Sequence, residues 1–315
     1  MEVRKFLPPL AAFAVGVLSA LQSRVNGELS VTLGNSLQAA FTSFTVGFLI
    51  VIILTIAIRS IRTGLRRIPG ALRDGSLKWW HLLTGFMGGL FVAVQSQTVP
   101  LVGVAVFTVA MVAGQSTNSL IVDRAGLGPA GKQAITARRV VSAVLAVLAV
   151  TVAVWNRAGS ANFSTIAIIV IFFAGAVVAV QQAFSGRVAR AAGSPLSATF
   201  LTFAVGSTAL GVAFALAWAF TGSDGTAMPS GPWWLYAGGL LGVFFIAITS
   251  WTVPILGVLV FALLAIAGQL SGALALDLFA PTKGTVVGWN LVVGVTLAFI
   301  AVSISVVGRS SKQVR

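Results

Sequence analysis

Carboxamide side chains recur inside otherwise apolar stretches of this chain, and they carry its most informative chemistry. They cluster near residues 22–26, 95–97, 115–118, 181–182 and 269. An amide both donates and accepts hydrogen bonds, so a group of them suits an uncharged or zwitterionic solute. Amides that join neighbouring helices are the alternative interpretation. We expect a substrate site lined by Gln22, Asn26, Gln95, Gln115, Asn118, Gln181, Ser185, Trp251 and Gln269, with the Trp251 ring stacking on a cationic or aromatic solute.

Acidic residues are scarce, and three of the six lie at the ends of apolar segments: Glu28, Asp123 and Asp277. Charged groups at such positions mark pathways for solutes or ions in membrane proteins. We predict a gate at each face, with Asp123 beside Arg187 on one face and Asp277 beside Arg24 on the other. Ordinary extension of charged side chains towards the membrane surface is the alternative.

Several kinds of chemistry are excluded by composition. The chain has no Cys and one His, so a thiolate or histidine metal centre is not expected. The sequence offers no nucleophile–base pair in an apolar segment, so we expect no catalytic residue and no cofactor. With 57% hydrophobic and 8% charged residues, the chain is far from the roughly 25% charge of soluble domains. The net charge of +14 therefore does not indicate nucleic acid binding, and the chain is predicted to be an integral membrane protein.

The elements that must position these side chains are helices that span the membrane. About 20 mainly apolar residues make one span. The sequence predicts ten, joined by short loops, with the basic stretch 59–78 as one of those loops. The predicted spans cover residues 7–29, 37–58, 79–98, 101–122, 138–155, 164–186, 195–220, 233–251, 255–276 and 288–307.

Basic residues predict which way the spans run. With ten spans, 17 of the 20 Lys and Arg residues fall on one side, and Arg24, Arg157 and Lys283 fall on the other. Cytoplasmic loops carry an excess of Lys and Arg. The split predicts a multi-pass protein of the cytoplasmic (inner) membrane, with both termini in the cytoplasm. Arg59 to Lys78 would also contact anionic lipid headgroups.

The two halves of the chain resemble each other. Residues 79–124 and 233–278 align without a gap and share 19 identities in 46 positions, including the pairs Gly114/Gly268 and Asp123/Asp277. Residues 14–50 and 173–209 share 11 in 37, including Gln22/Gln181. Each half would hold five spans, 1–158 and 159–315. Five is odd, so the second half would enter the membrane from the opposite side, as in inverted-repeat transporters.

Short motifs resemble a known family. Gly16, Ala20, Gln22, Asn26 and Gly27 form the pattern G-x-x-x-A-x-Q-x-x-x-N-G, and Ser43, Phe44 and Gly47 form S-F-x-x-G. The run P-x-x-G-x-x-x-F starts at Pro100 and again at Pro254. Together these are similar to the drug/metabolite transporter superfamily, in its YdcZ-like branch related to EamA-type transporters. The resemblance implies a ten-helix inner-membrane transporter of small metabolites or drug-like compounds. Ser185 departs from the pattern, because the first half has Asn26 there.

We therefore predict an all-α integral membrane protein with ten transmembrane helices in two inverted five-helix repeats. Its expected function is secondary transport by alternating access, in the export direction. A membrane-embedded enzyme and a passive channel or facilitator are the alternatives. The expected partners are a small-molecule substrate and membrane lipids, and the sequence leaves a homodimer open.

Overall fold

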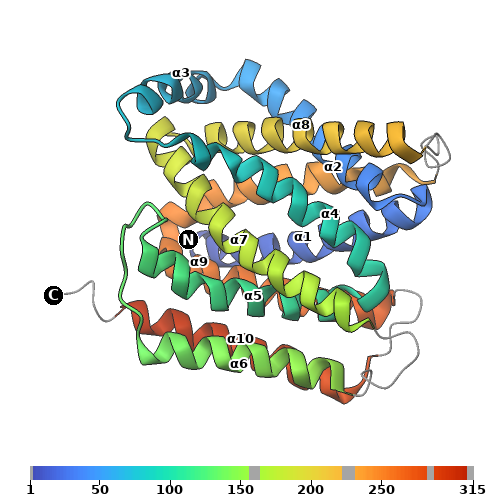
Figure 1. Ribbon diagram of the computed structural model, residues 1–315. Helices are drawn as coiled ribbons and strands as arrows, with labels where there is room; N and C mark the ends of the chain where they lie inside the picture. Colours follow the sequence, from blue (N-terminus) through green and yellow to red (C-terminus); the bar gives the residue numbers. More distant parts are fainter. Residues whose placement is uncertain (1–2, 156–163, 222–230, 282–286, 311–315) are drawn as a thin grey trace.

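The computed structural model describes residues 3–155, 164–221, 231–281 and 287–310, and over these ranges the chain is helical, without strands. The helices lie side by side in a single bundle (Figure 1). Their bounds are α1 Val3–Leu33, α2 Ser36–Ala57, α3 Arg59–Arg73, η1 Trp79–Leu83, α4 Thr84–Val102, α5 Val104–Ala125, α6 Ala137–Val154, α7 Thr165–Ala192, α8 Pro195–Thr221, η4 Trp233–Ala237, α9 Gly238–Phe279 and α10 Trp289–Ser310.

Eight helical segments in the described ranges are long and apolar enough to cross a membrane, and two shorter apolar ones cover Trp233–Ile246 and Trp289–Ile304. Each of the ten predicted spans overlaps one of these ten segments, although two of the segments lie largely in the same helix, α9. Large apolar side chains are exposed on the outer helices, for example Leu49 and Ile53 on α2 and Leu216 on α8. An apolar outer surface of this kind faces lipid rather than water. Arg157, Lys283 and the predicted boundary between the halves at residue 158 lie outside the described residues.

The largest difference from the prediction concerns α9, which is one helical element where two spans were expected. Its first part runs antiparallel to α1, since Gly238 lies beside Asn26 and Gly242 beside Gln22. Its last part runs parallel to α1, since Gly268 lies beside Phe13 and Gly272 beside Val17. The helix must therefore bend back on itself between residues 242 and 268. Pro254 lies in that interval, and proline disrupts the hydrogen bonding of a helix interior.

A second correction concerns the basic stretch 59–78, which was predicted to be a loop. Residues Arg59–Arg73 form the amphipathic helix α3. Its buried side is small and apolar, with Ile61, Gly64, Ile68 and Ala71, and it packs on α7 and α8. The basic side chains of this stretch stay exposed. The helix therefore places positive charge beside the end of α7 and the start of α8, which are predicted to lie at the cytoplasmic face.

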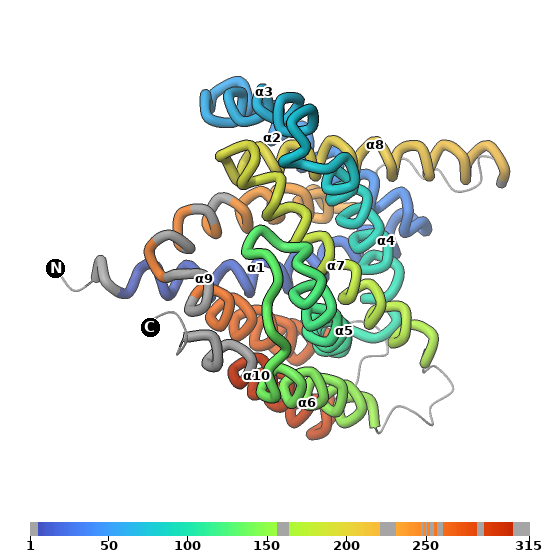
Figure 2. The backbone as a smooth tube through the Cα atoms, turned by 60° about the vertical axis from the view of Figure 1, so that its left-hand side comes forward, coloured from blue at the N-terminus to red at the C-terminus, as the bar shows by residue number. Residues whose placement is uncertain are grey.

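The most buried helix is α5, which lies between α7 on one side and α6, α9 and α10 on others. Every residue from Val104 to Gly114 is buried. Figure 2 shows the pair α6 and α10 at one edge of the bundle and α3 at the opposite edge. Helix α5 therefore lies at the centre of a group that also contains α1, α4, α6, α7, α9 and α10.

Close helix contacts occur in pairs that match the sequence repeat. Without a side chain, glycine lets two backbones approach directly. Gly268 meets the Phe13 carbonyl just as Gly114 meets the Phe172 carbonyl, and Gly16 meets the Ala265 carbonyl just as Gly175 meets the Met111 carbonyl. Each member of a pair is the repeat equivalent of the other. The contacts α1–α9 and α5–α7 are therefore equivalent in three dimensions as well as in sequence.

Candidate substrate and gating site

An aspartate lies at each end of the bundle. Asp277 lies at the end where α4 stops and α5 starts, and Asp123 lies at the other end of α5. These are the Asp277 end and the Asp123 end.

A buried hydrogen-bonded cluster joins α1 to α4 near the Asp277 end. The amide nitrogen of Asn26 donates to Gln95 Oε1 at 2.8 Å, and Gln95 Nε2 donates to Ser23 Oγ at 2.8 Å. One turn further along α1, Ser30 Oγ donates to the Ser96 carbonyl at 2.6 Å. Asn26, Gln95 and Ser23 are each exposed by 3% or less. This cluster, which we call the Asn26–Gln95 lock, closes the α1–α4 contact.

The repeat-equivalent residues at the Asp123 end behave differently. Gln182 replaces Ser23, Ser185 replaces Asn26 and Thr249 replaces Gln95. Gln182 is exposed, and Ser185 and Thr249 are half-buried. The Thr249 hydroxyl donates to the Phe245 carbonyl within its own helix. The face of α7 that corresponds to the buried face of α1 is therefore loosely covered.

The predicted amides do not gather at one point. Near the Asp123 end, Gln115 donates to Gln182 at 2.9 Å and Asn118 donates to the Ala176 carbonyl at 2.7 Å. Gln22 lies against Gly242 and Gln181 against Gly88, at equivalent places in the two halves. The predicted amides Gln22, Gln115, Asn118, Gln181 and Gln269 are all half-buried. Asn26 and Gln95 belong to the lock, and Trp251 is exposed.

Two hollows are described, and neither is lined by these amides. One is a small hollow beside Arg24, Glu28 and Pro100. The other is a groove of about 350 Å³ between α9 and α10, lined mainly by apolar side chains such as Leu274, Leu278 and Phe299. Among the described residues, no group of three His, Asp or Glu side chains could hold a metal ion.

The charged residues make contacts other than the predicted gate pairs. Asp123 forms an ion pair with Arg139, with Asp123 Oδ2 and Arg139 Nη2 2.5 Å apart. Arg24 forms an ion pair with Glu28, one turn further along α1. Arg139 is 6% exposed, whereas its neighbour Arg138 is exposed, and no sequence pattern distinguishes the two. A short-range charge pattern could have suggested Arg24 with Glu28, because residues four apart meet on a helix.

Helix α5 is capped at both ends by charged residues from the second half of the chain. Asp277 accepts hydrogen bonds from the backbone N–H groups of Val104 (3.0 Å) and Ala105 (2.8 Å). At the other end, Arg187 donates to the carbonyls of Gly126 (2.6 Å) and Leu127 (2.7 Å). An anion at the N-terminus and a cation at the C-terminus both complement the helix dipole. These two side chains therefore join α9 and α7 to the two ends of α5.

We expect Arg187→Gln to lower the melting temperature of the purified protein by several degrees. The change removes two hydrogen bonds from a charged group, and such bonds contribute about 1.5–3 kcal/mol each. Arg190 is the matched control, because it lies on the same helix, is exposed, and donates once, to the Pro129 carbonyl. Arg190→Gln should change the melting temperature less. Equal shifts for the two variants would mean that capping of α5 by Arg187 adds no stability.

Residues 7–152 and 166–304 match the protein family described as "Putative inner membrane exporter, YdcZ". The chain belongs to the YdcZ family. It is accordingly a multi-pass inner-membrane protein of a transporter family, as its apolar helices also indicate.

A solved structure, described only as "Crystal structure of protein", is similar in fold. It shares 19% sequence identity with this chain, with 97% of this chain and 98% of that chain covered and a TM-score of 0.53. At this identity the likeness supports the helical architecture alone. No curated protein matches the chain.

Proposed function

We propose that this YdcZ-family protein is a secondary transporter that exports a small uncharged or zwitterionic solute by alternating access. One observation carries the proposal. Equivalent faces of α1 and α7 differ in burial, since Ser23 and Asn26 are buried while Gln182 is exposed and Ser185 is half-buried. A protein built of two similar halves can exchange the two arrangements at little cost in energy, which would close one end while opening the other.

The proposed architecture is two inverted five-span repeats. The paired glycine contacts support it, and so do the directions of the equivalent helices. Helix α1 ends beside the lock at the Asp277 end, whereas α7, its equivalent, ends beside Gly126 and Leu127 at the Asp123 end. Two equivalent helices that run in opposite directions are what an odd number of spans per repeat produces.

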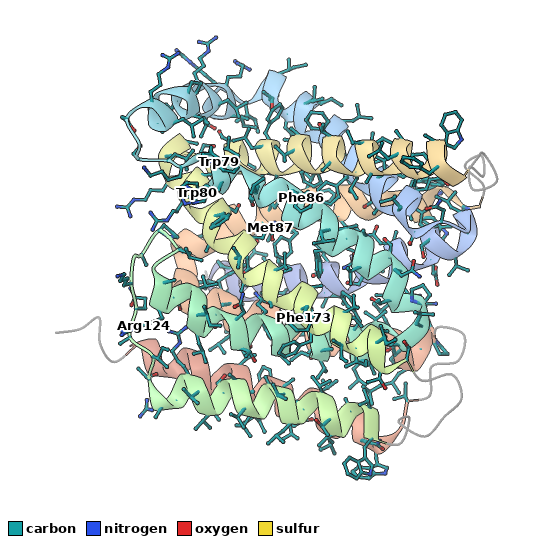
Figure 3. All side chains as sticks on the ribbon, viewed as in Figure 1. Trp79, Trp80, Phe86, Met87, Arg124 and Phe173 are labelled. Carbon is teal, nitrogen blue, oxygen red and sulfur yellow. The ribbon has the colours of Figure 1, made fainter. Side chains whose placement is uncertain are left out.

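We assign the Asp123 end to the cytoplasm. Arg124, Trp79 and Trp80 lie towards the same end of the bundle (Figure 3), and α3 carries its exposed arginines beside them. Lys and Arg are enriched in cytoplasmic loops, and Trp is enriched at membrane surfaces. With this assignment, the described conformation is closed to the outside and faces inward. In it, Gln115, Asn118 and Gln181 are the amides best placed to meet a solute from the cytoplasm.

Flux across proteoliposomes tests the function. We expect saturable uptake or counterflow for at least one member of a panel of labelled zwitterionic amino acids and neutral polar metabolites. Gln115→Leu should lower that flux about tenfold or more, since an amide that binds substrate contributes at least one hydrogen bond. Gln97→Leu is the control, because Gln97 is exposed and accepts from Ser36. Flux that does not saturate would instead indicate a channel, as a channel needs no change of conformation per solute.

A further inference from the structure

The apolar side of helix α3 is packed against the Asp123 end of the bundle. Ser197 Oγ on α8 donates to the Ile61 carbonyl at 3.0 Å, and Gly64 lies against the Ala192 carbonyl at the end of α7. Farther along α3, Ile68 joins a buried apolar cluster with the same parts of α7 and α8. Because these contacts fall on the last turns of α7 and the first turns of α8, α3 crosses the ends of these helices instead of running alongside them.

The opposite side of α3 carries a row of arginines. Arg59, Arg66 and Arg73 are spaced seven residues apart, which places them on one face at intervals of about 10.5 Å along the helix. At about 3.6 residues per turn, this face points away from Ile61 and Ile68 on the buried face. All three arginines are exposed, and among the described residues their side chains form no hydrogen bond or ion pair. We call these three residues the arginine row.

Other charged residues of this stretch have contacts within the protein, which sets the arginine row apart. Arg62 donates to the Thr55 carbonyl at 2.8 Å, near the end of α2. Arg67 lies against Gly193, where α7 ends. Asp74 accepts a hydrogen bond from the backbone N–H two residues further on, at 2.9 Å. The arginine row is therefore the part of α3 whose charge is available to a partner outside the chain.

Exposed apolar side chains on both sides of α3 indicate its depth in the membrane. Ile56, at the end of α2, and Trp79, which follows α3, are both largely exposed. Trp is enriched where the hydrocarbon meets the headgroups, and a helix with one apolar and one basic face lies in that plane. Helix α3 also lies at the edge of the bundle (Figure 2), where lipid surrounds the protein. Lipid headgroups are therefore the groups nearest to the arginine row.

We propose that the arginine row of α3 is a binding site for the headgroups of anionic phospholipids. The sequence predicts lipid contact for the whole stretch 59–78, and the structure assigns it to one face of one helix. A guanidinium group binds phosphate oxygens through charge-assisted hydrogen bonds, often two at a time. Because α3 is already fixed on its apolar side, binding costs little further ordering. Lipid that holds α3 also holds the turn between α7 and α8, so it stabilises the folded bundle.

A fluorophore on α3 tests which lipid lies beside it. The chain has no cysteine, so Gly70→Cys provides a single labelling site, and Gly70 is exposed with nothing within 4 Å of a Cβ built there. The labelled full-length protein is placed in phosphatidylcholine nanodiscs that contain a small share of nitroxide-labelled phosphatidylglycerol or, in a parallel sample, nitroxide-labelled phosphatidylcholine. Stronger quenching by phosphatidylglycerol at the same share measures its enrichment beside α3. No solute is needed, so the outcome is independent of the flux assay.

We expect phosphatidylglycerol to be enriched about tenfold or more beside α3, because each basic residue near an anionic surface strengthens binding about fivefold. Replacing all three residues of the arginine row by Gln should remove most of this enrichment, and high salt should weaken it in the native protein.

The matched control removes the same charge from the same end of the bundle. It combines three exposed basic residues outside α3, in the changes Arg124→Gln, Lys132→Gln and Arg138→Gln. The control should keep the enrichment beside α3. Phosphatidylglycerol should also raise the melting temperature of the native and control proteins more than that of the arginine-row variant, and these melting curves confirm that each variant folds.

Equal quenching by the two lipids in the native protein would overturn the proposal. Equal losses of enrichment in the two triple variants would overturn it too, because the lipid would then respond to the charge of the whole face. RNA or polyglutamate added at physiological salt should not displace phosphatidylglycerol, and displacement would show that a soluble polyanion is the preferred partner instead. Where the arginine-row variant does not fold, Arg66→Gln alone is measured. Its enrichment should fall about fivefold, and an unchanged value would again overturn the proposal.

Discussion

Alanine in place of Gly114 or Gly268 should prevent the native bundle from forming at normal temperatures, whereas alanine in place of Gly70 should be tolerated. A Cβ atom at Gly114 would overlap the Phe172 carbonyl oxygen, and one at Gly268 would overlap the Phe13 carbonyl oxygen. A backbone carbonyl in a packed helix has no alternative rotamer, so the helices themselves would have to separate. Forcing extra volume into a packed interior costs about 1–3 kcal/mol even where side chains can adjust, and here they cannot.

Gly70 provides the matched control because it is also a helical glycine, in α3. Nothing lies within 4 Å of a Cβ built there. Alanine favours a helix over glycine by about 1 kcal/mol, so Gly70→Ala should be neutral or slightly stabilising. The three proteins are compared by size-exclusion chromatography and melting in the same detergent. A Gly114→Ala protein that melts within a few degrees of native would show that α5 and α7 do not pack as closely as described.

The sequence carried enough information to locate the helices, because a span needs a long apolar run and this chain has few charges to interrupt one. The repeat also pairs Gly114 with Gly268, and the structure places both at equivalent close helix contacts, which the sequence pairing alone does not identify. Helix α3 is also predictable from the sequence, because Ile61, Gly64 and Ile68 recur at helical spacing between its arginines and give it a buried face.

The partners of the charged residues could not be found in the same way. Asp277 is bonded to backbone N–H groups, and these appear in no sequence pattern because every residue except proline has one. Asp123 was assigned to Arg187 by treating the two ends as alike. One conformation of a protein with two similar halves has unlike ends, so Arg139 holds Asp123 while Arg187 caps α5. Sequence symmetry predicts which residues are equivalent, and the conformation decides what each one contacts.

Gln95→Leu should open the Asp277 end of the protein. Gln95 is the centre of the Asn26–Gln95 lock, since its carbonyl accepts from Asn26 and its amide nitrogen donates to Ser23. Leucine keeps the volume and removes both bonds, which leaves the Asn26 amide without that partner in a buried position. Interhelical hydrogen bonds in membranes contribute about 0.6–1.7 kcal/mol each, so losing two should shift the balance of conformations about tenfold.

A single cysteine at Ser30 measures this shift by its rate of alkylation with a charged maleimide, because the chain has no cysteine of its own and Ser30 lies on α1 one turn beyond Asn26. Its alkylation should be about tenfold faster in the Gln95→Leu background. Thr249→Val is the matched control, since Thr249 is the repeat equivalent of Gln95 and its hydroxyl bonds only within α9 among the contacts described. It should leave the Ser30→Cys rate unchanged. A Gln95→Leu protein that folds, keeps slow alkylation at Ser30→Cys and melts like the native protein would show that packing of α1 on α4, rather than the polar lock, closes the Asp277 end.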